Sequence, residues 1–335
     1  MVDLMGEISR ISKGVSNELS KIMEELNVPN VLRESSYHLL KAGGKRLRPF
    51  MLVKSYEACG GTGSKPYPAA VAVEILHTFT LIHDDIIDRD ETRRGVPTVH
   101  VLWGVPQAII SGDMLFALVF KVLSKNLKSE GVKESVIVDV IERLSEALIH
   151  ICAGQTIDMA LAEKPIRNVT MEDYMEMISL KTARLYMVSA EIGGLIAEAS
   201  PKDVEALKSY GFYSGMAFQM VDDILGVSGV EEELGKPVGS DIREGKKTIV
   251  MLEALNRLDD RGRRRLMEIL GNRSASREQI LEAISLVEAS GAVEHVKKLA
   301  RQYSSEAKKT LTSLPKTEAR DLLEALTDFI VERKY

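Results

Sequence analysis

Apolar residues recur every three or four positions through most of this chain. One such stripe holds Val136, Val140, Leu144, Leu148 and Cys152. That spacing places its members on one face of a helix, and an apolar helical face has to be buried against other helices. No segment alternates apolar and polar residues for long enough to predict a strand. The pattern therefore predicts an all-α protein.

The positions of the ten prolines predict how the helices are joined. The prolines fall between helical segments or at their starts, where a fixed φ and a missing N–H are tolerated. Hydrophobic residues make up 45% of the 335 positions, which is enough for a sizeable core, and no repeat or linker divides them. We expect residues 1–335 to form a single domain, one large bundle of about a dozen helices around a central active-site cavity.

Charge and cysteine content exclude several classes of protein. The formal net charge of −5 argues against a nucleic-acid binder. The two cysteines, Cys59 and Cys152, form neither a disulfide framework nor a CxxC motif, so a reducing cytoplasm is expected. The first 20 residues mix charged with apolar side chains, unlike a signal peptide. Proline, glycine and charged residues interrupt the run from Val101 to Leu123, so no membrane span is expected.

An acidic cluster ends the apolar helical run that starts at Ala69. In a helix, Asp84 and Asp88 lie one turn apart, about 40° from each other, and Asp85 flanks them. Like charges at this spacing destabilise a helix, and a bound cation relieves that cost. Mg²⁺ suits such a position because it is held by a few carboxylates together with water and substrate phosphates. Taken alone, the motif fits a solvated acidic helix end equally well.

A second acidic cluster and three basic elements extend this pattern. Asp222 and Asp223 lie in another apolar helical stretch about 140 residues later, and a helical bundle can bring two such clusters to one cavity. The basic elements are GGKRLRP (43–49), ETRRG (91–95) and the pair Lys181-Thr182. Glycines let a backbone approach an anion, and Lys and Arg bind phosphate oxygens. Each element alone could be a solvated turn or surface lysine, but together they predict a site for phosphorylated substrates and metal ions.

These motifs resemble those of the trans-type polyprenyl synthetase family, whose short-chain members make geranylgeranyl or farnesyl diphosphate. The resemblance covers residues 41–248 and rests on six motifs: GGKRLRP (43–49), HTFTLIHDDIIDRDETRRG (77–95), GQTID (154–158), KTA (181–183), FQMVDDILG (218–226) and GKPVGSDIREGKKT (235–248). It implies the isoprenoid synthase fold and a prenyltransferase that joins isopentenyl diphosphate head-to-tail to an allylic diphosphate. Relatives are commonly homodimers, so a homodimer is expected.

The resemblance also implies a role for each matching residue. Isopentenyl diphosphate would be bound by Lys45, Arg48, His77 and Arg94. The allylic diphosphate would be bound by Arg93, Lys181, Lys236 and Lys246. Thr182 and Gln219 would line the place where positive charge develops during the reaction.

The resemblance implies three Mg²⁺ ions in the substrate-bound site. Asp84 and Asp88, assisted by Asp85, would hold two of them. Asp222 would hold the third, with help from Asp223. Many relatives have another aspartate where this chain has Gly226. We expect the reaction to survive this departure because Mg²⁺ keeps much of its water.

Two residues that precede the first acidic cluster would set product length. In the family, the product grows down an apolar tunnel, and the resemblance makes Phe79 its floor. One aromatic residue followed by Thr80 implies the twenty-carbon geranylgeranyl diphosphate, with the farnesyl product or a longer chain as alternatives. A helical wheel instead favours Thr80, which lies about 40° from Asp84, whereas Phe79 lies about 140° away. Phe79 would then be ordinary core packing.

Three other functions were weighed against this pattern. A terpene cyclase needs no second diphosphate site, so Lys45, Arg48 and Arg94 favour the synthase. A non-catalytic subunit of a heteromeric synthase would be expected to have lost aspartates, and the first cluster here is complete. A di-iron carboxylate bundle would need Glu-x-x-His pairs, which do not occur in a fitting arrangement.

Overall fold

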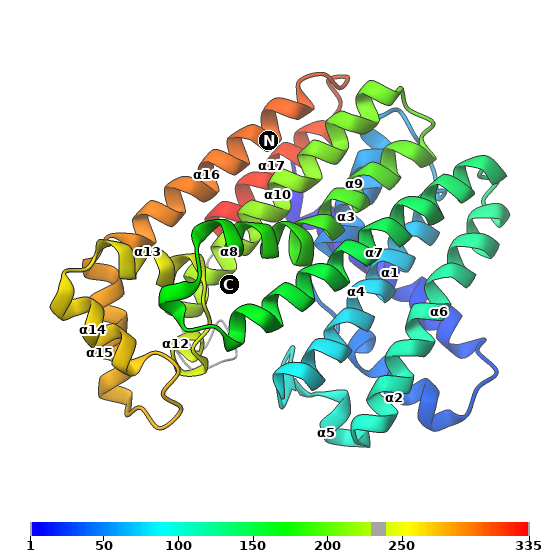
Figure 1. Cartoon of the computed structure of the whole chain (residues 1–335). Helices are drawn as coiled ribbons and strands as arrows, with labels where there is room; N and C mark the ends of the chain where they lie inside the picture. The colour runs from blue at the N-terminus through cyan, green and yellow to red at the C-terminus, as the bar shows by residue number, and fades with distance from the viewer. Residues whose placement is uncertain (1, 229–238, 334–335) are drawn as a thin grey trace. The chain divides into compact units, whose positions relative to one another are not determined.

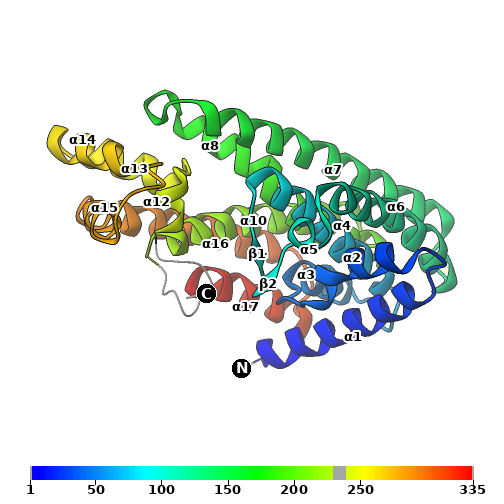
Figure 2. The same cartoon turned by 90° about the horizontal axis from the view of Figure 1, so that it is seen from below.

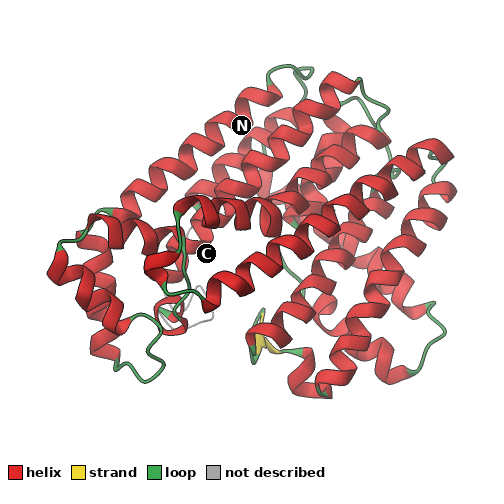
Figure 3. Ribbon diagram, viewed as in Figure 1, coloured by secondary structure: helices red, strands yellow, loops and turns green. Residues whose placement is uncertain are grey.

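The computed structural model describes residues 2–228 and 239–333, and most of them lie in helices (Figure 3). Within that part of the chain the only strands are β1 (Thr92–Arg93) and β2 (Val96–Pro97), which pair antiparallel. The prediction of an all-α fold is confirmed. The described residues divide into two compact units, each built from several stretches of the chain. That they form a single domain around one cavity stays a prediction.

The first unit contains the N-terminal helices and gathers them around α4. Its described stretches are 2–146, 185–208 and 311–325. Its elements are α1 (Leu4–Glu24), α2 (Asn30–Lys41), α3 (Leu47–Ala58), α4 (Tyr67–Asp88), α5 (Val99–Trp103), α6 (Val105–Ser129), part of α7 (Glu134–Glu163), most of α9 (Arg184–Ile196) and parts of α10 (Pro201–Ser228), α16 (Ala292–Leu311) and α17 (Glu318–Glu332).

Helix α4 is the central helix of this unit, and its sequence explains why. Every residue from Pro68 to Leu76 is buried, so the helix is apolar around its whole circumference there. It packs against α1, α2, α3 and α6, and Figure 1 shows α6 running beside it. The helix ends at Asp88 because Arg89 adopts a left-handed conformation with φ 59°. The short hairpin of β1 and β2 then links α4 to α5 (Figure 2).

Among the described residues, the second unit contains stretches 147–184, 209–228, 239–310 and 326–333. Its elements are the end of α7, a 3₁₀ turn (Ile166–Asn168), α8 (Met171–Ile178), a π-helical turn (Ser179–Ala183), the end of α10, α12 (Ser240–Glu244), α13 (Ile249–Arg257), α14 (Asp260–Ile269), α15 (Arg277–Ala289), most of α16 and the end of α17. Capping boxes start α8 at Thr170 and α15 at Ser276. They satisfy backbone N–H groups at the N-terminus of each of these two helices.

Helix α6 is long and apolar enough to cross a membrane, judged by length and composition. A core helix of a soluble protein passes the same test. Helix α6 packs against α4 and α2, and 44% of its most apolar window is buried. The absence of a membrane span therefore stays a prediction.

Candidate active site

The first acidic cluster occupies the last turn of α4. Asp84 is half-buried and Asp88 is exposed, so both carboxylates can be reached from solvent. Their position at a helix C-terminus is unfavourable, because the partial negative charge of the helix end adds to their mutual repulsion. A cation beside them would offset both costs. The predicted metal role of this pair fits the place where α4 puts it.

Asp85 differs from its two neighbours because it points into the protein. Its side chain is 1% exposed and forms an ion pair with the Nε of Arg93, which also contacts Asp90 at 3.1 Å. This arrangement favours a role in fixing Arg93 over the expected help in metal binding. Arg93 itself is 24% exposed, so its guanidinium can still meet a ligand.

A buried carboxylate organises the basic residues of the first unit. Glu74 is 3% exposed and forms an ion pair with Arg46, which also donates to the carbonyl oxygen of Leu40 at 2.7 Å. Arg94 lies 3.6 Å from the same Glu74 oxygen. Burial lowers the pKa of Arg94, which Glu74 opposes and the neighbouring arginines reinforce. Glu74 therefore offsets part of the repulsion between guanidinium groups that stand close together.

His77 and Arg48 continue this basic cluster. The Nη1 atom of Arg48 lies 3.3 Å from Nε2 of His77, and its guanidinium stacks over the Tyr186 ring at 4.3 Å. Burial and nearby arginines, Arg48 foremost, hold the pKa of His77 well below its usual value. His77 is therefore neutral at pH 7 and can accept or donate one hydrogen bond. The fold thus brings together four residues predicted to bind diphosphate: Arg48, His77, Arg93 and Arg94. Lys45, which is also predicted to bind diphosphate, directly precedes Arg46 in the chain.

In the second unit, a π-helical turn from Ser179 to Ala183 presents Lys181 and Thr182. Such turns are rare and are often found at functional sites. Lys181 forms an ion pair of 2.5 Å with Asp158. Gly154 makes the turn possible, because a side chain there would overlap the backbone of Lys181. The GQTID motif, which received no role from the sequence, therefore shapes and orients the Lys181-Thr182 pair.

Gln219 belongs to a hydrogen-bond chain that runs into the core of the second unit. Its Oε1 accepts from Thr182 at 2.9 Å, and its Nε2 donates to Oδ1 of Asp223 at 2.9 Å. The other oxygen of Asp223 accepts from the hydroxyl of Tyr174 and from the backbone N–H of Ile249, at 3.3 Å for the latter. Burial raises the pKa of Asp223 to about 7, and these hydrogen bonds limit the rise.

Asp222 and Asp223 point in different directions. Asp223 is 4% exposed, and protein donors bind both its oxygens, so its surroundings argue against the expected help in metal binding. The side chain of Asp222 is 40% exposed and forms an ion pair with Arg333. The predicted metal role of Asp222 fits this exposure, and a metal there would displace Arg333.

Arg333 is held firmly, although its place in the C-terminal tail would fit a frayed end. Its side chain is 7% exposed. It donates to the carbonyl oxygen of Phe218 at 2.9 Å, and its guanidinium lies 3.8 Å from the centre of the Phe218 ring. The ion pair to Asp222 is a third contact. The last described residue is thus part of the candidate site.

The missing third aspartate of the second motif has a structural counterpart. A side chain at Gly226 would overlap the carboxylate of Asp241. Asp241 therefore fills the space that the glycine leaves, with its side chain 14% exposed. Lys246 lies 3.4 Å from Asp241 and also pairs with Glu244 at 3.0 Å. Lys236, which was also expected to bind diphosphate, lies outside the described residues.

Among the described residues, no group of three or more His, Cys, Asp and Glu side chains lies closely enough to hold a metal ion alone. This donor set still fits Mg²⁺. Magnesium needs one or two carboxylates when substrate phosphates and water complete its coordination. Among the residues predicted to hold metal, Asp84 and Asp222 are partly exposed and Asp88 is exposed.

The two candidate product-length residues have different surroundings. The Phe79 ring packs against His83, with centroids 4.9 Å apart, and against Phe116 on α6, with centroids 5.5 Å apart. The hydroxyl of Thr80 donates to the carbonyl oxygen of His77 at 2.8 Å. Phe79 is therefore packed on the α6 side of α4 while remaining partly exposed. Its role as the tunnel floor stays a prediction.

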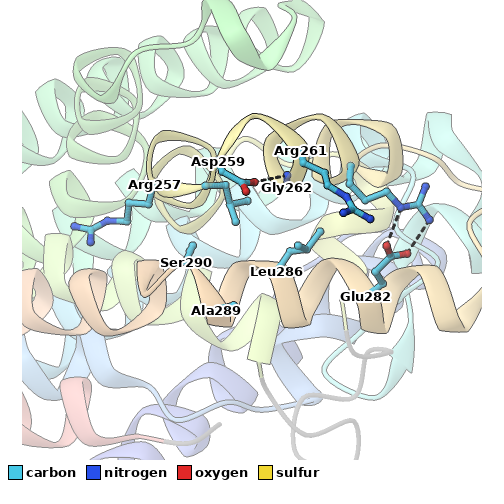
Figure 4. A pocket seen from close by; sticks show the side chains of 10 residues that line it. Arg257, Asp259, Arg261, Gly262, Glu282, Leu286, Ala289 and Ser290 are labelled. Atoms are coloured by element: carbon cyan, nitrogen blue, oxygen red, sulfur yellow. Dashed lines mark hydrogen bonds and ion pairs between the residues drawn. The ribbon is translucent and has the colours of Figure 1, made fainter.

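A surface pocket lies between α14 and α15, outside all the motifs (Figure 4). The ion pair between Arg265 and Glu282, 2.7 Å long, bridges the two helices there. Asp259 caps α14 by accepting from the N–H of Gly262 at 2.7 Å. Arg265, Glu282 and Asp259 thus have structural partners, and no residue of this pocket was predicted to take part in catalysis.

Sequence reasoning missed the part played by Glu74 in the first unit and by Tyr174 and Asp158 in the second. A signal existed for Glu74, because it is the single charged residue in the apolar run from Ala69 to Leu76. A lone carboxylate in such a run has to be paired when it is buried. Tyr174 gave no comparable signal, because its partner lies 49 residues away.

The chain matches the family model described as "Polyprenyl synthetase" over residues 29–287. A short chain isoprenyl diphosphate synthase of Methanothermobacter thermautotrophicus is 41% identical over 335 residues, with all of both chains covered. A geranylgeranyl diphosphate synthase of Saccharolobus solfataricus is 43% identical over 305 residues, with 90% of each chain covered.

Solved structures give the same result. The geranylgeranyl pyrophosphate synthetase of Pyrococcus horikoshii superposes with a TM-score of 0.88 at 39% identity, with 98% of each chain covered. The geranylgeranyl pyrophosphate synthase of Corynebacterium glutamicum, solved with isoprenyl diphosphate and magnesium, superposes with a TM-score of 0.88 at 28% identity, with 99% of this chain and all of that one covered.

This chain belongs to the polyprenyl synthetase family. It is a prenyltransferase of isoprenoid biosynthesis. The predictions of family, fold and enzyme class are confirmed.

Proposed function

We propose that this enzyme makes geranylgeranyl diphosphate by successive head-to-tail addition of isopentenyl diphosphate to allylic diphosphates. The similarity to geranylgeranyl diphosphate synthases across nearly the whole chain supports this product. The observation that carries the two-substrate chemistry is the basic cluster around Glu74. It offers a place for a diphosphate that does not depend on the carboxylates at the end of α4.

The isopentenyl diphosphate site is the part of the basic cluster formed by Lys45, Arg48, His77 and Arg94. An arginine guanidinium can bind two phosphate oxygens at once. Because guanidinium groups lie close together here, a bound anion would relieve their mutual repulsion. Neutral His77 adds a hydrogen bond without adding repulsion. A terpene cyclase would not need this second site.

Asp84 and Asp88 would hold the Mg²⁺ ions that bind the allylic diphosphate, and Asp222 would hold a third ion. Arg93, which Asp85 holds in place, and Lys181, which Asp158 holds in place, add direct contacts to the diphosphate. Bound divalent ions neutralise diphosphate charge and so make it a better leaving group.

The protein's own groups then control the allylic cation. The hydroxyl of Thr182 and the amide oxygen of Gln219, 2.9 Å apart, direct the negative ends of their dipoles at the developing charge. The site has to exclude water, which would otherwise capture the cation. The double bond of isopentenyl diphosphate forms the new carbon–carbon bond, and loss of one proton to the departing pyrophosphate completes the step.

One assay tests the proposed reaction. Radiolabelled isopentenyl diphosphate is incubated with dimethylallyl, geranyl or farnesyl diphosphate and Mg²⁺, and the dephosphorylated products are sized by chromatography. We expect a twenty-carbon product that disappears when the metal is chelated. Accumulation of a fifteen-carbon product would support a farnesyl diphosphate synthase, and chains beyond twenty carbons a longer-chain synthase. A cyclised hydrocarbon, or no product from the purified chain, would overturn the proposal.

The active form proposed here is a homodimer. Helices α5 and α6 expose a row of large apolar side chains, each 44–50% exposed in the single chain: Val101, Leu102, Val105, Ile109 and Ile110. A surface of this kind marks an interaction site in most soluble proteins, and a second copy of the chain would cover it. Sedimentation equilibrium should give twice the chain mass, and a monomer at micromolar concentration would contradict this assignment.

We also propose that the enzyme works in the cytoplasm. Cys152 is exposed and Cys59 is partly buried, and neither forms a disulfide. Free thiols of this kind persist in a reducing compartment. Cell fractionation with activity measurements would test this, since recovery of the activity in a secreted fraction would contradict it.

A further inference from the structure

The amide of Gln219 could face the substrate side in either of two ways. Its oxygen carries partial negative charge and would stabilise a cation, whereas its NH₂ group carries partial positive charge and would repel one. The packing of α10 does not choose between them, because the two ends of the amide have nearly the same shape. The choice depends on the hydrogen-bond partners of the amide.

Those partners form a chain of hydrogen bonds, and the first group in it is a backbone N–H that can only donate. The backbone N–H of Ile249, at the start of α13, can only donate, and it points at Oδ2 of Asp223. Tyr174 supplies a second bond to the same oxygen from α8. Asp223 and Tyr174 are 4% and 1% exposed, so water does not compete for these positions.

The remaining oxygen of Asp223 then sets the orientation of Gln219. Ionised Asp223 accepts hydrogen bonds at both oxygens, so the end of the Gln219 amide that meets Oδ1 at 2.9 Å is the NH₂ group. The amide oxygen is consequently at the other end, where the Thr182 hydroxyl donates to it at 2.9 Å. Gln219 and Asp223 are four residues apart on α10, which keeps them on one face of the helix.

We propose that Asp223 and Tyr174 are positioning residues, which hold the Gln219 amide with its oxygen toward the developing allylic cation. This inference rests on the proposed function, because it assumes that Gln219 lies beside that cation. It gives Asp223 a task different from that of its neighbour Asp222, although the two are adjacent in the chain. Neither Asp223 nor Tyr174 touches the reacting atoms in this scheme.

The substitution Asp223→Asn tests the proposal because it preserves size but changes the hydrogen-bond pattern. Asparagine has one accepting end, which the N–H of Ile249 claims, so its NH₂ end faces Gln219. That arrangement turns the Gln219 amide around and reverses its dipole. We expect kcat to fall about 100-fold, the scale known for losing one preorganised dipole, with little change in the apparent KM for isopentenyl diphosphate. Tyr174→Phe, which leaves the Ile249 bond in place, should lower kcat about tenfold, the equivalent of one hydrogen bond.

A double-mutant cycle separates positioning from a merely structural role. Gln219→Ala should lower kcat, and adding Asp223→Asn to it should lower kcat no further. Asp173→Asn is the matched control, because Asp173 caps α8 next to Tyr174 without contacting Gln219. It should leave kcat unchanged. Thermal unfolding of each variant reports whether the fold is intact.

The outcomes distinguish the inference from the function beneath it. If Gln219→Ala leaves kcat unchanged, the proposed role of Gln219 near the cation fails, and the inference fails with it. If Gln219→Ala lowers kcat but Asp223→Asn does not, the positioning role is overturned while the proposed function stands. The same holds if Asp223→Asn lowers the kcat of the Gln219→Ala variant as much as it lowers that of the unsubstituted enzyme. If Asp223→Asn does not fold, Tyr174→Phe carries the same cycle.

Discussion

Glu74 offers the sharpest test of how this enzyme builds its basic cluster. Its carboxylate and the Arg46 guanidinium are 3% and 1% exposed, and the Arg94 guanidinium lies 3.6 Å away. Glu74→Ala would leave Arg46 buried with the Leu40 carbonyl oxygen as its remaining hydrogen-bond partner. Breaking a buried ion pair from one side costs about 3–5 kcal/mol. We expect a loss of unfolding free energy in that range, and a smaller one for Glu74→Gln, which still accepts a bond.

Urea denaturation followed by circular dichroism measures this loss. Glu134→Ala is the matched control, because its ion pair with Lys128 joins two exposed side chains at 2.7 Å. It should leave the unfolding midpoint unchanged. A loss below about 1 kcal/mol for Glu74→Ala, the value typical of surface pairs, would refute the reasoning.

The same substitution should also weaken substrate binding. Without Glu74 the guanidinium of Arg94 loses its counter-charge and its fixed position, so the apparent KM for isopentenyl diphosphate should rise more than that for the allylic substrate. The double variant Arg46→Met/Glu74→Leu removes both buried charges and should regain much of the stability. We expect its KM defect to remain. An unchanged KM in this variant would show that the pair serves stability alone.

Four further predictions concern the candidate site. Asp84→Asn should lower kcat by orders of magnitude without unfolding the protein, and near-normal activity at saturating Mg²⁺ would contradict its metal role. Lys45→Ala and Arg48→Ala should mainly raise the apparent KM for isopentenyl diphosphate, whereas an equal loss for both substrates would mean that the two diphosphate sites are misassigned. Phe79→Ala should release products longer than twenty carbons if Phe79 is the tunnel floor. Unchanged products would identify Phe79 as core packing, with a loss of about 3 kcal/mol in unfolding free energy, the lower end of the range for a buried Phe because the ring is partly exposed. Arg333→Ala should lower the Mg²⁺ concentration needed for half-maximal activity and the Kd for Mg²⁺ in titration calorimetry, because the guanidinium no longer competes for its carboxylate; an unchanged metal affinity would contradict this competition.

The helices were the most predictable part of the structure. Three- and four-residue spacing of apolar side chains is a local signal, and a helix that has to bury one face leaves it in the sequence. Boundaries were less predictable. The polar composition of residues 125–133 favours a loop, yet α6 continues to Ser129 and buries Leu127. A polar surface turn of a helix and a polar loop have similar compositions, so composition alone could not place the end.

The sequence alone determined which residue types the site would contain and which helices would carry them. The spacing of Asp84 and Asp88 and the order of the basic motifs were sufficient for that, because both depend on neighbours within one turn or one loop. The tertiary structure decided which of two adjacent aspartates is exposed and which is buried. Asp222 and Asp223 are about 100° apart on a helix, so one faces solvent and the other the core. Asp223 is the buried one because Tyr174 of α8 and Ile249 of α13 bind it, and both come from distant parts of the chain. No local pattern records such partners, because burial is a property of the packed helices and not of the segment that becomes buried.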